Sequence, residues 1–241
     1  MTTLRFAGHI DVSVSTGGRD IGTDGPIVIL VHGAGMDRTA WSLQTRWLAH
    51  HGCPAIAIDL PGHGASAEDE VASIDAYAEW LAKLVRALER PVHVVGHSMG
   101  SFIALECATK VDLASITLVG TAAAMPVHPA LLDAAEANDP LAAQLMAGWA
   151  FAPATRTGPH PSPGNSMVGA NLAMVAQTKN GVLFKDLSAC TNYQSAVETA
   201  ARLSLPVTFL LGALEKMNSV RAALQLYQIH VRRYSSSIPA R

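Results

Sequence analysis

Residues 92–100 read Val-His-Val-Val-Gly-His-Ser-Met-Gly, and this stretch decides the fold. The β-branched residues up to Val95 predict a short buried strand, and the apolar run that follows Gly100 predicts a helix. The turn between them is a G-x-S-x-G pentapeptide. Such a turn holds its serine in a strained backbone conformation with the hydroxyl exposed, and its glycines remove the clashes that a Cβ would cause. The stretch therefore indicates that Ser98 is a nucleophile at the start of a helix.

The pentapeptide alone has a second interpretation. The chain has 19 glycines among 241 residues, so about 0.1 such matches arise by chance. On that interpretation Ser98 caps the following helix through its side chain, as serines commonly do. The rest of the chain distinguishes the two.

The composition is typical of a compact globular protein. Of the residues, 49% are apolar and 15% are charged, and the net charge is −2. This balance gives no electrostatic reason to expect a nucleic acid or an anionic membrane as a partner. The sequence contains no apolar leader and no run of membrane-spanning length, so we expect a cytoplasmic protein with no membrane partner.

The three cysteines, Cys53, Cys107 and Cys190, are scattered along the chain. Their spacing matches no metal site, and their odd number argues against a disulfide framework. We therefore expect free, buried thiols in a reducing compartment and no bound metal.

Short apolar runs alternate with helical patterns in the first half of the chain. An alternating stretch predicts a hairpin over residues 5–15. The other expected strands are 27–31, 54–59, 92–95 and 113–119, and the expected helices are 41–51, 74–88 and 101–110. Strands that alternate with helices predict an α/β fold with a doubly wound, mostly parallel sheet.

The pattern changes between residues 121 and 204, where no convincing strand is found. Helical pieces separated by Pro- and Gly-rich breaks are expected at 129–137, 141–149 and 170–177. The sheet resumes at 206–211, and a helix follows from about 219 to 229. We interpret these parts as an α/β core (1–120 and 205–230), a helical cap over the strand ends (121–204) and a disordered tail (231–241).

Three strand ends carry turns with chemically active residues. They are His32-Gly33-Ala34, the pentapeptide itself, and Gly212-Ala-Leu-Glu215. Ligands bind at the carboxyl ends of the strands in open α/β sheets, so these turns are expected to meet there. A fourth motif, Ala57-Ile-Asp-Leu-Pro-Gly-His-Gly-Ala-Ser66, follows the strand at 54–59.

In their order and spacing these four motifs resemble the α/β-hydrolase fold superfamily over about residues 4–229. The resemblance implies a serine hydrolase that needs no cofactor. Ser98 would attack the substrate, the backbone N–H groups of Ala34 and Met99 would form the oxyanion hole, and Glu215 would be the catalytic acid. A serine at this position distinguishes the chain from the aspartate-nucleophile dehalogenases and epoxide hydrolases.

Several other residues have less specific interpretations. Glu215 stands where the superfamily usually has aspartate, and the alternative is a surface glutamate paired with Lys216. The histidines of the turns are expected to shape the site rather than act as bases; they are His32, His63 and His97. Apolar cap residues could line an acyl pocket, although packing explains each of them equally simply: Met146, Trp149, Phe151, Met167 and Met174.

The C-terminal stretch departs from the superfamily pattern. The resemblance implies one more strand after the acid, then the catalytic histidine and a final helix. After Glu215 the sequence offers only His230, so His230 is the one candidate for the base. We expect that the final strand and helix are missing through truncation or a frameshift after Gln228, and that the strand at 207–211 is left with an exposed edge.

The leading hypothesis is a hydrolase of a small carboxylic ester or lactone that forms an acyl-enzyme on Ser98, with activity impaired by loss of the histidine. One alternative is a catalytically inactive ligand-binding protein of the same fold, or a pseudogene product. Another is a C–C bond hydrolase or a cofactor-free peroxidase, which use the same catalytic groups. The sequence indicates no oligomeric state.

Overall fold

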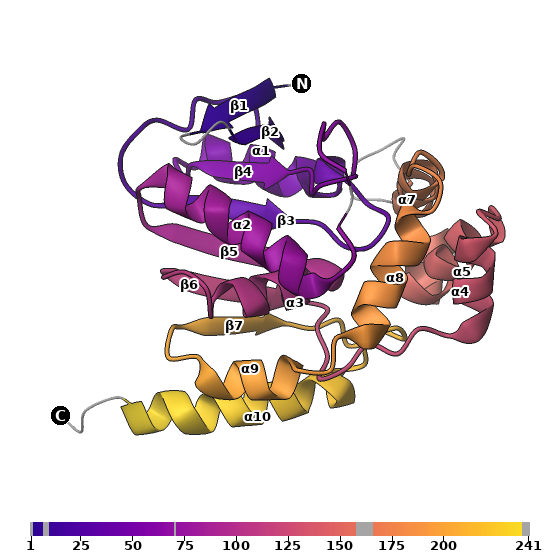
Figure 1. Ribbon diagram of the computed structural model, residues 1–241. Helices are drawn as coiled ribbons and strands as arrows, with labels where there is room; N and C mark the ends of the chain where they lie inside the picture. The colour runs from indigo at the N-terminus through magenta and orange to yellow at the C-terminus, as the bar shows by residue number, and fades with distance from the viewer. Residues whose placement is uncertain (1, 7–9, 70, 158–165, 238–241) are drawn as a thin grey trace.

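The computed structural model describes residues 2–6, 10–69, 71–157 and 166–237, with side chains except those of residues 2, 6, 10 and 231–237. It contains a seven-stranded sheet in the order β1-β2-β4-β3-β5-β6-β7 (Figure 1). The strands are β1 (Thr2–Phe6), β2 (Ile10–Ser15), β3 (Ile27–Val31), β4 (Ala55–Ile58), β5 (Val92–His97), β6 (Ser115–Val119) and β7 (Val207–Leu210). The pairings β1–β2 and β2–β4 are antiparallel and all others are parallel. The expected mostly parallel α/β fold is confirmed.

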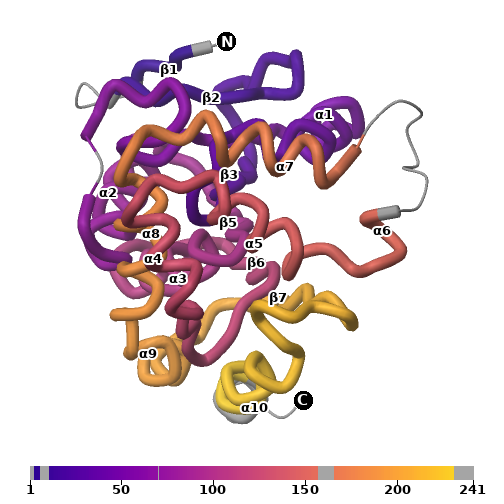
Figure 2. The backbone as a smooth tube through the Cα atoms, turned by 90° about the vertical axis from the view of Figure 1, so that its right-hand side faces the viewer, coloured from indigo at the N-terminus to yellow at the C-terminus, as the bar shows by residue number. Residues whose placement is uncertain are grey.

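Helices pack on both faces of this sheet, which is why its central strands are almost wholly apolar. The helices α2 (Ile74–Leu88) and α3 (Met99–Cys107) cover one face, and α1 (Ser42–His50) lies on the other (Figures 1 and 2). A 3-10 turn, η1 (Arg38–Trp41), leads into α1. Alternate residues of β3 therefore enter different clusters: Ile29 packs into the large core under α2 and α3, whereas Leu30 packs with Trp41.

The cap between β6 and β7 is helical, as expected. Its helices are α4 (Pro129–Glu136), α5 (Leu141–Ala150), α6 (Pro153–Thr157), α7 (Met167–Ala176), α8 (Val182–Asn192) and α9 (Ala196–Arg202). Figure 2 shows α4, α5, α7 and α8 lying across the carboxyl ends of the central strands. The sequence pattern located α4, α5 and α7 but missed the other three. In α8 the reason is its composition, because Ser188, Cys190 and Thr191 are weak helix formers.

The last described helix, α10 (Val220–Ser237), is longer than expected. It continues through residues 231–237, where a disordered tail was expected, and this part of the prediction is wrong; residues 238–241 lie outside the described part of the chain. The stretch has no proline or glycine before Pro239. Adding residues to an existing helix costs far less free energy than nucleating a new one. The helix packs on α9, and its Tyr227 ring meets Phe209 of β7 edge-on at 5.6 Å.

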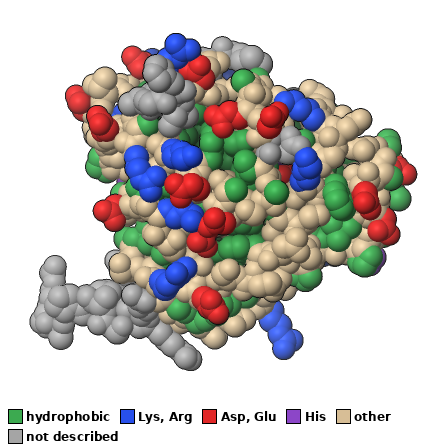
Figure 3. Space-filling view, viewed as in Figure 1, with side chains coloured by type: hydrophobic (Ala, Val, Ile, Leu, Met, Phe, Trp, Pro, Cys, Tyr) green, Lys and Arg blue, Asp and Glu red, His purple; other side chains and the backbone are tan. Residues whose placement is uncertain are grey.

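Strand β7 is the last strand of the sheet order within the described residues. Its Leu210 is 59% exposed, and Leu214 in the following turn is 69% exposed. On the face drawn in Figure 3, acidic and basic side chains are interspersed over α2, whereas every residue of α3 is buried. No helix in the described ranges is both long enough and apolar enough to span a membrane.

Candidate active site

Ser98 lies between β5 and α3 in a strained conformation. Its φ of 52° and ψ of −117° place it in a region that non-glycine residues rarely adopt. The residue occupies the N-cap position of α3, but its side chain makes no capping hydrogen bond. Its backbone is held instead, because Ser98 N–H donates to the Val119 carbonyl at 2.9 Å and Ser101 Oγ donates to the Ser98 carbonyl at 2.6 Å. The Ser98 hydroxyl therefore does not cap α3, which contradicts the capping interpretation, and it is available to act as a nucleophile.

The two glycines of the pentapeptide allow this geometry. A Cβ on Gly96 would lie 2.0 Å from the Gly100 carbonyl oxygen, and a Cβ on Gly100 would lie 2.5 Å from that of Val31 and 2.6 Å from that of His32. Contacts this short are impossible for real side chains. The elbow and the end of β3 consequently pack backbone against backbone.

The turn after β3 lies directly beside the nucleophile. A Cβ on Gly33 would be 3.3 Å from Ser98 Cβ. The Gly33 carbonyl accepts hydrogen bonds from His32 Nδ1–H at 2.9 Å and from Met36 N–H at 3.2 Å. A trans peptide directs its N–H opposite to its carbonyl, so the N–H of Ala34 points away from these donors.

Two backbone N–H groups are thus available near Ser98. Within the described residues neither Ala34 N–H nor Met99 N–H donates to a protein acceptor. Met99 is the first residue of α3, where backbone N–H groups lack intrahelical partners and the helix dipole favours negative charge. The arrangement suits an oxyanion that develops on a carbonyl attacked by Ser98.

His32 is a fixed, neutral part of the same turn. Its Nδ1 carries the proton that is donated to Gly33, and its Nε2 accepts from Leu60 N–H at 3.2 Å. Burial, followed by the nearby charge of His63, lowers the pKa of His32 from 6.5 to about 3. Burial also lowers the pKa of His97.

Acid is expected to destabilise the fold through His32. An unfolded histidine takes up a proton below about pH 6.5, whereas folded His32 does so only near pH 3. The unfolded state therefore binds more protons between these values, and the free energy of unfolding falls as the pH decreases, by at most about 1.4 kcal/mol per pH unit for one group. Urea unfolding between pH 7.5 and 4.5 measures this slope. His32→Gln should have a shallower slope than the wild type, and equal slopes would contradict the assignment.

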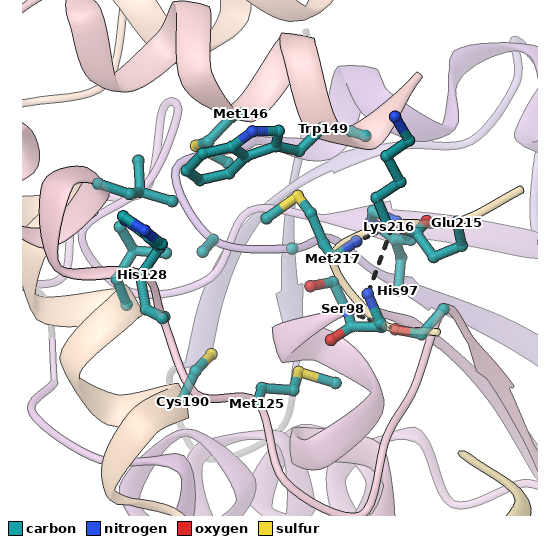
Figure 4. A pocket seen from close by; sticks show the side chains of 18 of the residues that line it. His97, Ser98, Met125, His128, Met146, Trp149, Cys190, Glu215, Lys216 and Met217 are labelled. Atoms are coloured by element: carbon teal, nitrogen blue, oxygen red, sulfur yellow. Dashed lines mark hydrogen bonds between the residues drawn. The ribbon is translucent and has the colours of Figure 1, made fainter. Parts of the chain in front are cut away.

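A cavity of about 400 Å³ opens over Ser98, between the strand ends and the cap (Figure 4). Figure 4 shows Ser98 and Glu215 on one side, with Trp149 and Met146 above them. Of the cap residues considered for an acyl pocket, these two line the cavity, whereas Phe151, Met167 and Met174 are not among its lining residues. The wall is mainly apolar. Its other large apolar side chains are Met36, Met125, Val127, Leu131, Leu187 and Met217.

Glu215 is held in a tight turn after β7. Its Oε1 accepts hydrogen bonds from Met217 N–H at 2.8 Å and from Asn218 N–H at 3.4 Å. The alternative was a surface ion pair with Lys216, but no such pair is present in the described part of the chain. The carboxylate lines the same cavity as Ser98.

The structure does not bring His230 to this cavity. His230 lies within α10, is 4% exposed and is not among the lining residues; burial lowers its pKa. Among the described residues, the histidines that line the cavity are His97 and His128. The ring of His97 lies edge-on to Trp41, and His128 Nδ1 accepts from Ala130 N–H to cap α4. Neither is hydrogen-bonded to Ser98.

Several residues of the site had not been predicted. Asn218 donates from Nδ2 to the Gly120 carbonyl at 2.9 Å and so fixes the Glu215 turn against the end of β6. Asn171 of α7 lines the cavity although it is 7% exposed, and its Oδ1 has no hydrogen-bond partner. Neither belongs to a sequence motif. The described residues contain no cluster of three or more metal-ligating side chains.

The comparison with protein families gives a match to the alpha/beta hydrolase family over residues 28–238, which is most of the chain. Among curated proteins, the pimeloyl-[acyl-carrier protein] methyl ester esterase of Methylococcus capsulatus is 38% identical over 108 residues, 44% of this chain and 39% of that protein. The (E)-2-((N-methylformamido)methylene)succinate hydrolase of Acinetobacter baylyi is 37% identical over 82 residues, 33% of this chain and 31% of that protein. The aligned part thus spans well under half of the length of these relatives.

Solved structures superpose on a larger share of the chain than the curated proteins align with. An esterase from Exiguobacterium antarcticum superposes with a TM-score of 0.77 at 16% identity, covering 94% of this chain and 86% of that one. A thermophilic esterase from Thermogutta terrifontis has a TM-score of 0.76 at 22% identity, covering 95% and 86%. At these identities the likeness concerns the fold.

Proposed function

The chain belongs to the alpha/beta hydrolase family, and from this premise we propose that it hydrolyses a small carboxylic ester or lactone through an acyl-enzyme on Ser98. The observation that carries the proposal is the strained elbow, where Ser98 lines an apolar cavity and its hydroxyl makes no capping hydrogen bond. The esterases and hydrolases among the relatives support the reaction type.

The proposed reaction has two halves. Ser98 Oγ attacks the ester carbonyl and loses its proton to a base, while the N–H groups of Ala34 and Met99 bind the oxyanion. Collapse of the tetrahedral intermediate expels the alcohol and leaves an acyl group on Ser98. Water then attacks the acyl group and releases the acid. The apolar cavity wall suits an acyl chain, and no cofactor takes part.

The described residues of this site include no identified general base. The proposed acid, Glu215, is oriented and lines the cavity, but among the described residues no histidine is hydrogen-bonded to Glu215 or to Ser98. A hydrolase without its base retains only the contribution of the oxyanion hole and of substrate binding. We therefore propose an impaired hydrolase.

Free imidazole is expected to restore part of this activity. A small base that enters the cavity can hydrogen-bond to Glu215 and accept the Ser98 proton, and general-base catalysis is worth at least about tenfold in rate. Ester hydrolysis should rise with imidazole concentration in the wild type and much less in Glu215→Gln. Pyrazole, which has the same shape but is a far weaker base, serves as the control. An equal response to imidazole in the wild type and in Glu215→Gln would rule out this role for Glu215, and an equal response to imidazole and pyrazole would rule out general-base rescue.

The lack of a histidine bonded to Ser98 or Glu215 among the described residues also favours a second function. This function is binding of a small ligand under the cap without turnover. The two are separated by assaying a panel of p-nitrophenyl esters, lactones and β-diketones, together with thermal unfolding in the presence of each compound. Turnover of an ester or lactone above the buffer rate supports the hydrolase. Thermal stabilisation without turnover supports the binding protein, and turnover restricted to β-diketones would indicate C–C bond hydrolysis.

A further inference from the structure

Asp186 belongs to the cap helix α8, but its carboxylate is buried against the core and is 0% exposed. Its Oδ2 accepts the N–H of Gly35 at 2.8 Å, and it also lies 2.7 Å from His63 Nε2. Its Oδ1 accepts the hydroxyl proton of Tyr77 at 3.1 Å. One side chain of the cap thus joins the turn after β3, the turn after β4 and helix α2.

The His63 ring is a buried cation in this arrangement. Its Nδ1 faces the Pro61 carbonyl at 2.9 Å, and its Nε2 faces the Asp186 carboxylate. Both partners can only accept, so both ring nitrogens carry a proton. Burial opposes the charge, yet the Asp186 carboxylate raises the pKa of His63 above its usual value. His32, whose ring centroid is 4.8 Å away, is correspondingly neutral.

Hydrogen bonds hold the peptide groups on both sides of Ala34. The Gly33 carbonyl is bonded to His32, Gly35 N–H is bonded to Asp186, and the Gly35 carbonyl accepts from Thr178 Oγ1 at 2.7 Å. Thr178 also comes from the cap, just after α7. The Ala34 N–H lies between these fixed groups. Gly35 itself has a φ of 63°, and a Cβ there would lie 2.7 Å from Leu183 of α8.

We propose that Asp186 is a positioning residue for the oxyanion-binding turn, so that the cap helix α8 completes the reactive site as well as covering it. This inference rests on the proposed function, because it assigns the turn to oxyanion binding. The carboxylate acts through Gly35, whose peptide group is covalently joined to Ala34, and the charge of His63 holds the carboxylate in place. A shift of about 1 Å in such a donor can cost on the order of a hundredfold in rate.

The experiment compares the rate of fluorophosphonate labelling of Ser98 in Asp186→Asn with that in the wild type and in the control variant Tyr77→Phe. Asparagine keeps the shape but removes the charge that keeps His63 doubly protonated. Neutral His63 donates from Nδ1 to the Pro61 carbonyl and leaves a lone pair on Nε2, so the amide NH₂ of asparagine turns toward Nε2 and no longer accepts from Gly35 N–H. We expect the maximal labelling rate to fall about tenfold to a hundredfold with little change in the half-saturating probe concentration. Tyr77→Phe removes another hydrogen bond from the same carboxylate without touching the turn, and should stay within about threefold of the wild type.

A second pair of variants, at Thr178, tests the same proposal if Asp186→Asn does not fold. Thr178→Val removes the hydrogen bond to the Gly35 carbonyl and should also slow labelling, whereas Thr178→Ser keeps the hydroxyl and should restore it. An equal loss in Asp186→Asn and Tyr77→Phe would overturn the proposal, because it would indicate general destabilisation. So would unchanged labelling in folded Asp186→Asn, or in Thr178→Val.

Amide hydrogen exchange separates this inference from the proposed function. The Gly35 amide should exchange at least about tenfold faster in Asp186→Asn than in the wild type and Tyr77→Phe. Unchanged exchange would overturn the positioning role whether or not Ser98 reacts. Absence of labelling in the wild type, with faster exchange in the variant, would instead reject the serine hydrolase and retain the contact between cap and turn.

Discussion

Gly100→Ala is expected to destabilise the protein by more than about 3 kcal/mol and to abolish the reactivity of Ser98. The new Cβ would lie 2.5 and 2.6 Å from the carbonyl oxygens of Val31 and His32. Those atoms belong to the backbone at the end of the central strand β3 and in the turn that follows it, so they cannot move aside as a flexible side chain would. Relief of the clash must push the elbow away from the turn that carries Ala34. The midpoint of thermal unfolding should fall by roughly 6–12 °C at about 2–4 °C per kcal/mol.

Gly148→Ala is the matched control for this substitution. Gly148 lies inside α5, and a Cβ there would meet no atom within 4 Å. Alanine at such a helical position stabilises by roughly 0.5–1 kcal/mol. Differential scanning calorimetry of both variants therefore tests the packing of the elbow separately from the general effect of replacing glycine. Equal unfolding temperatures in the two variants would contradict the close packing of Gly100 on β3.

Ser98→Ala is expected to abolish the imidazole-dependent part of ester hydrolysis, a loss of at least about tenfold, because the covalent route through Oγ is then closed. The side chain makes no capping hydrogen bond, so its removal should change the free energy of unfolding by less than about 1 kcal/mol. Loss of activity without loss of stability distinguishes a nucleophile from a structural serine. Initial rates and urea unfolding of the same preparation measure the two quantities.

Ser101→Ala provides the comparison for Ser98→Ala. Ser101 lies in the first turn of α3, and its hydroxyl donates to the Ser98 carbonyl at 2.6 Å and accepts from the Thr121 hydroxyl at 3.0 Å. Its removal should lower stability by about 1 kcal/mol and leave the covalent reaction in place. If Ser101→Ala rather than Ser98→Ala eliminated hydrolysis, the nucleophile would be misassigned.

The sheet and its main helices could be predicted because each has a local signature. Strand β3 was expected and found at 27–31, and α2 was expected and found at 74–88, because an apolar run and a 3.6-residue repeat are both properties of neighbouring residues. The elbow was predictable for a similar reason. Its two glycines and its serine stand within five residues, and their chemistry depends on that short turn.

The contacts that cross the cap could not be predicted in this way. Asp186 bonds to Gly35 across 151 positions of sequence, and nothing in its neighbouring residues indicates that this charged side chain will be buried. His63 was expected only to shape the site, and its charge becomes visible once the carboxylate of α8 is placed beside it. The position of His230 also depended on tertiary structure, because it was decided by whether the chain turned back or continued as α10.

The most direct test of the account is the covalent modification of Ser98. Intact protein is incubated with a fluorophosphonate, and the adduct is mapped by mass spectrometry after proteolysis. We predict one added phosphonyl group on the wild type, located on Ser98 and retained in Ser101→Ala but absent from Ser98→Ala. No adduct at high probe concentration, or an adduct that persists in Ser98→Ala, would contradict the assignment of this chain as a serine hydrolase.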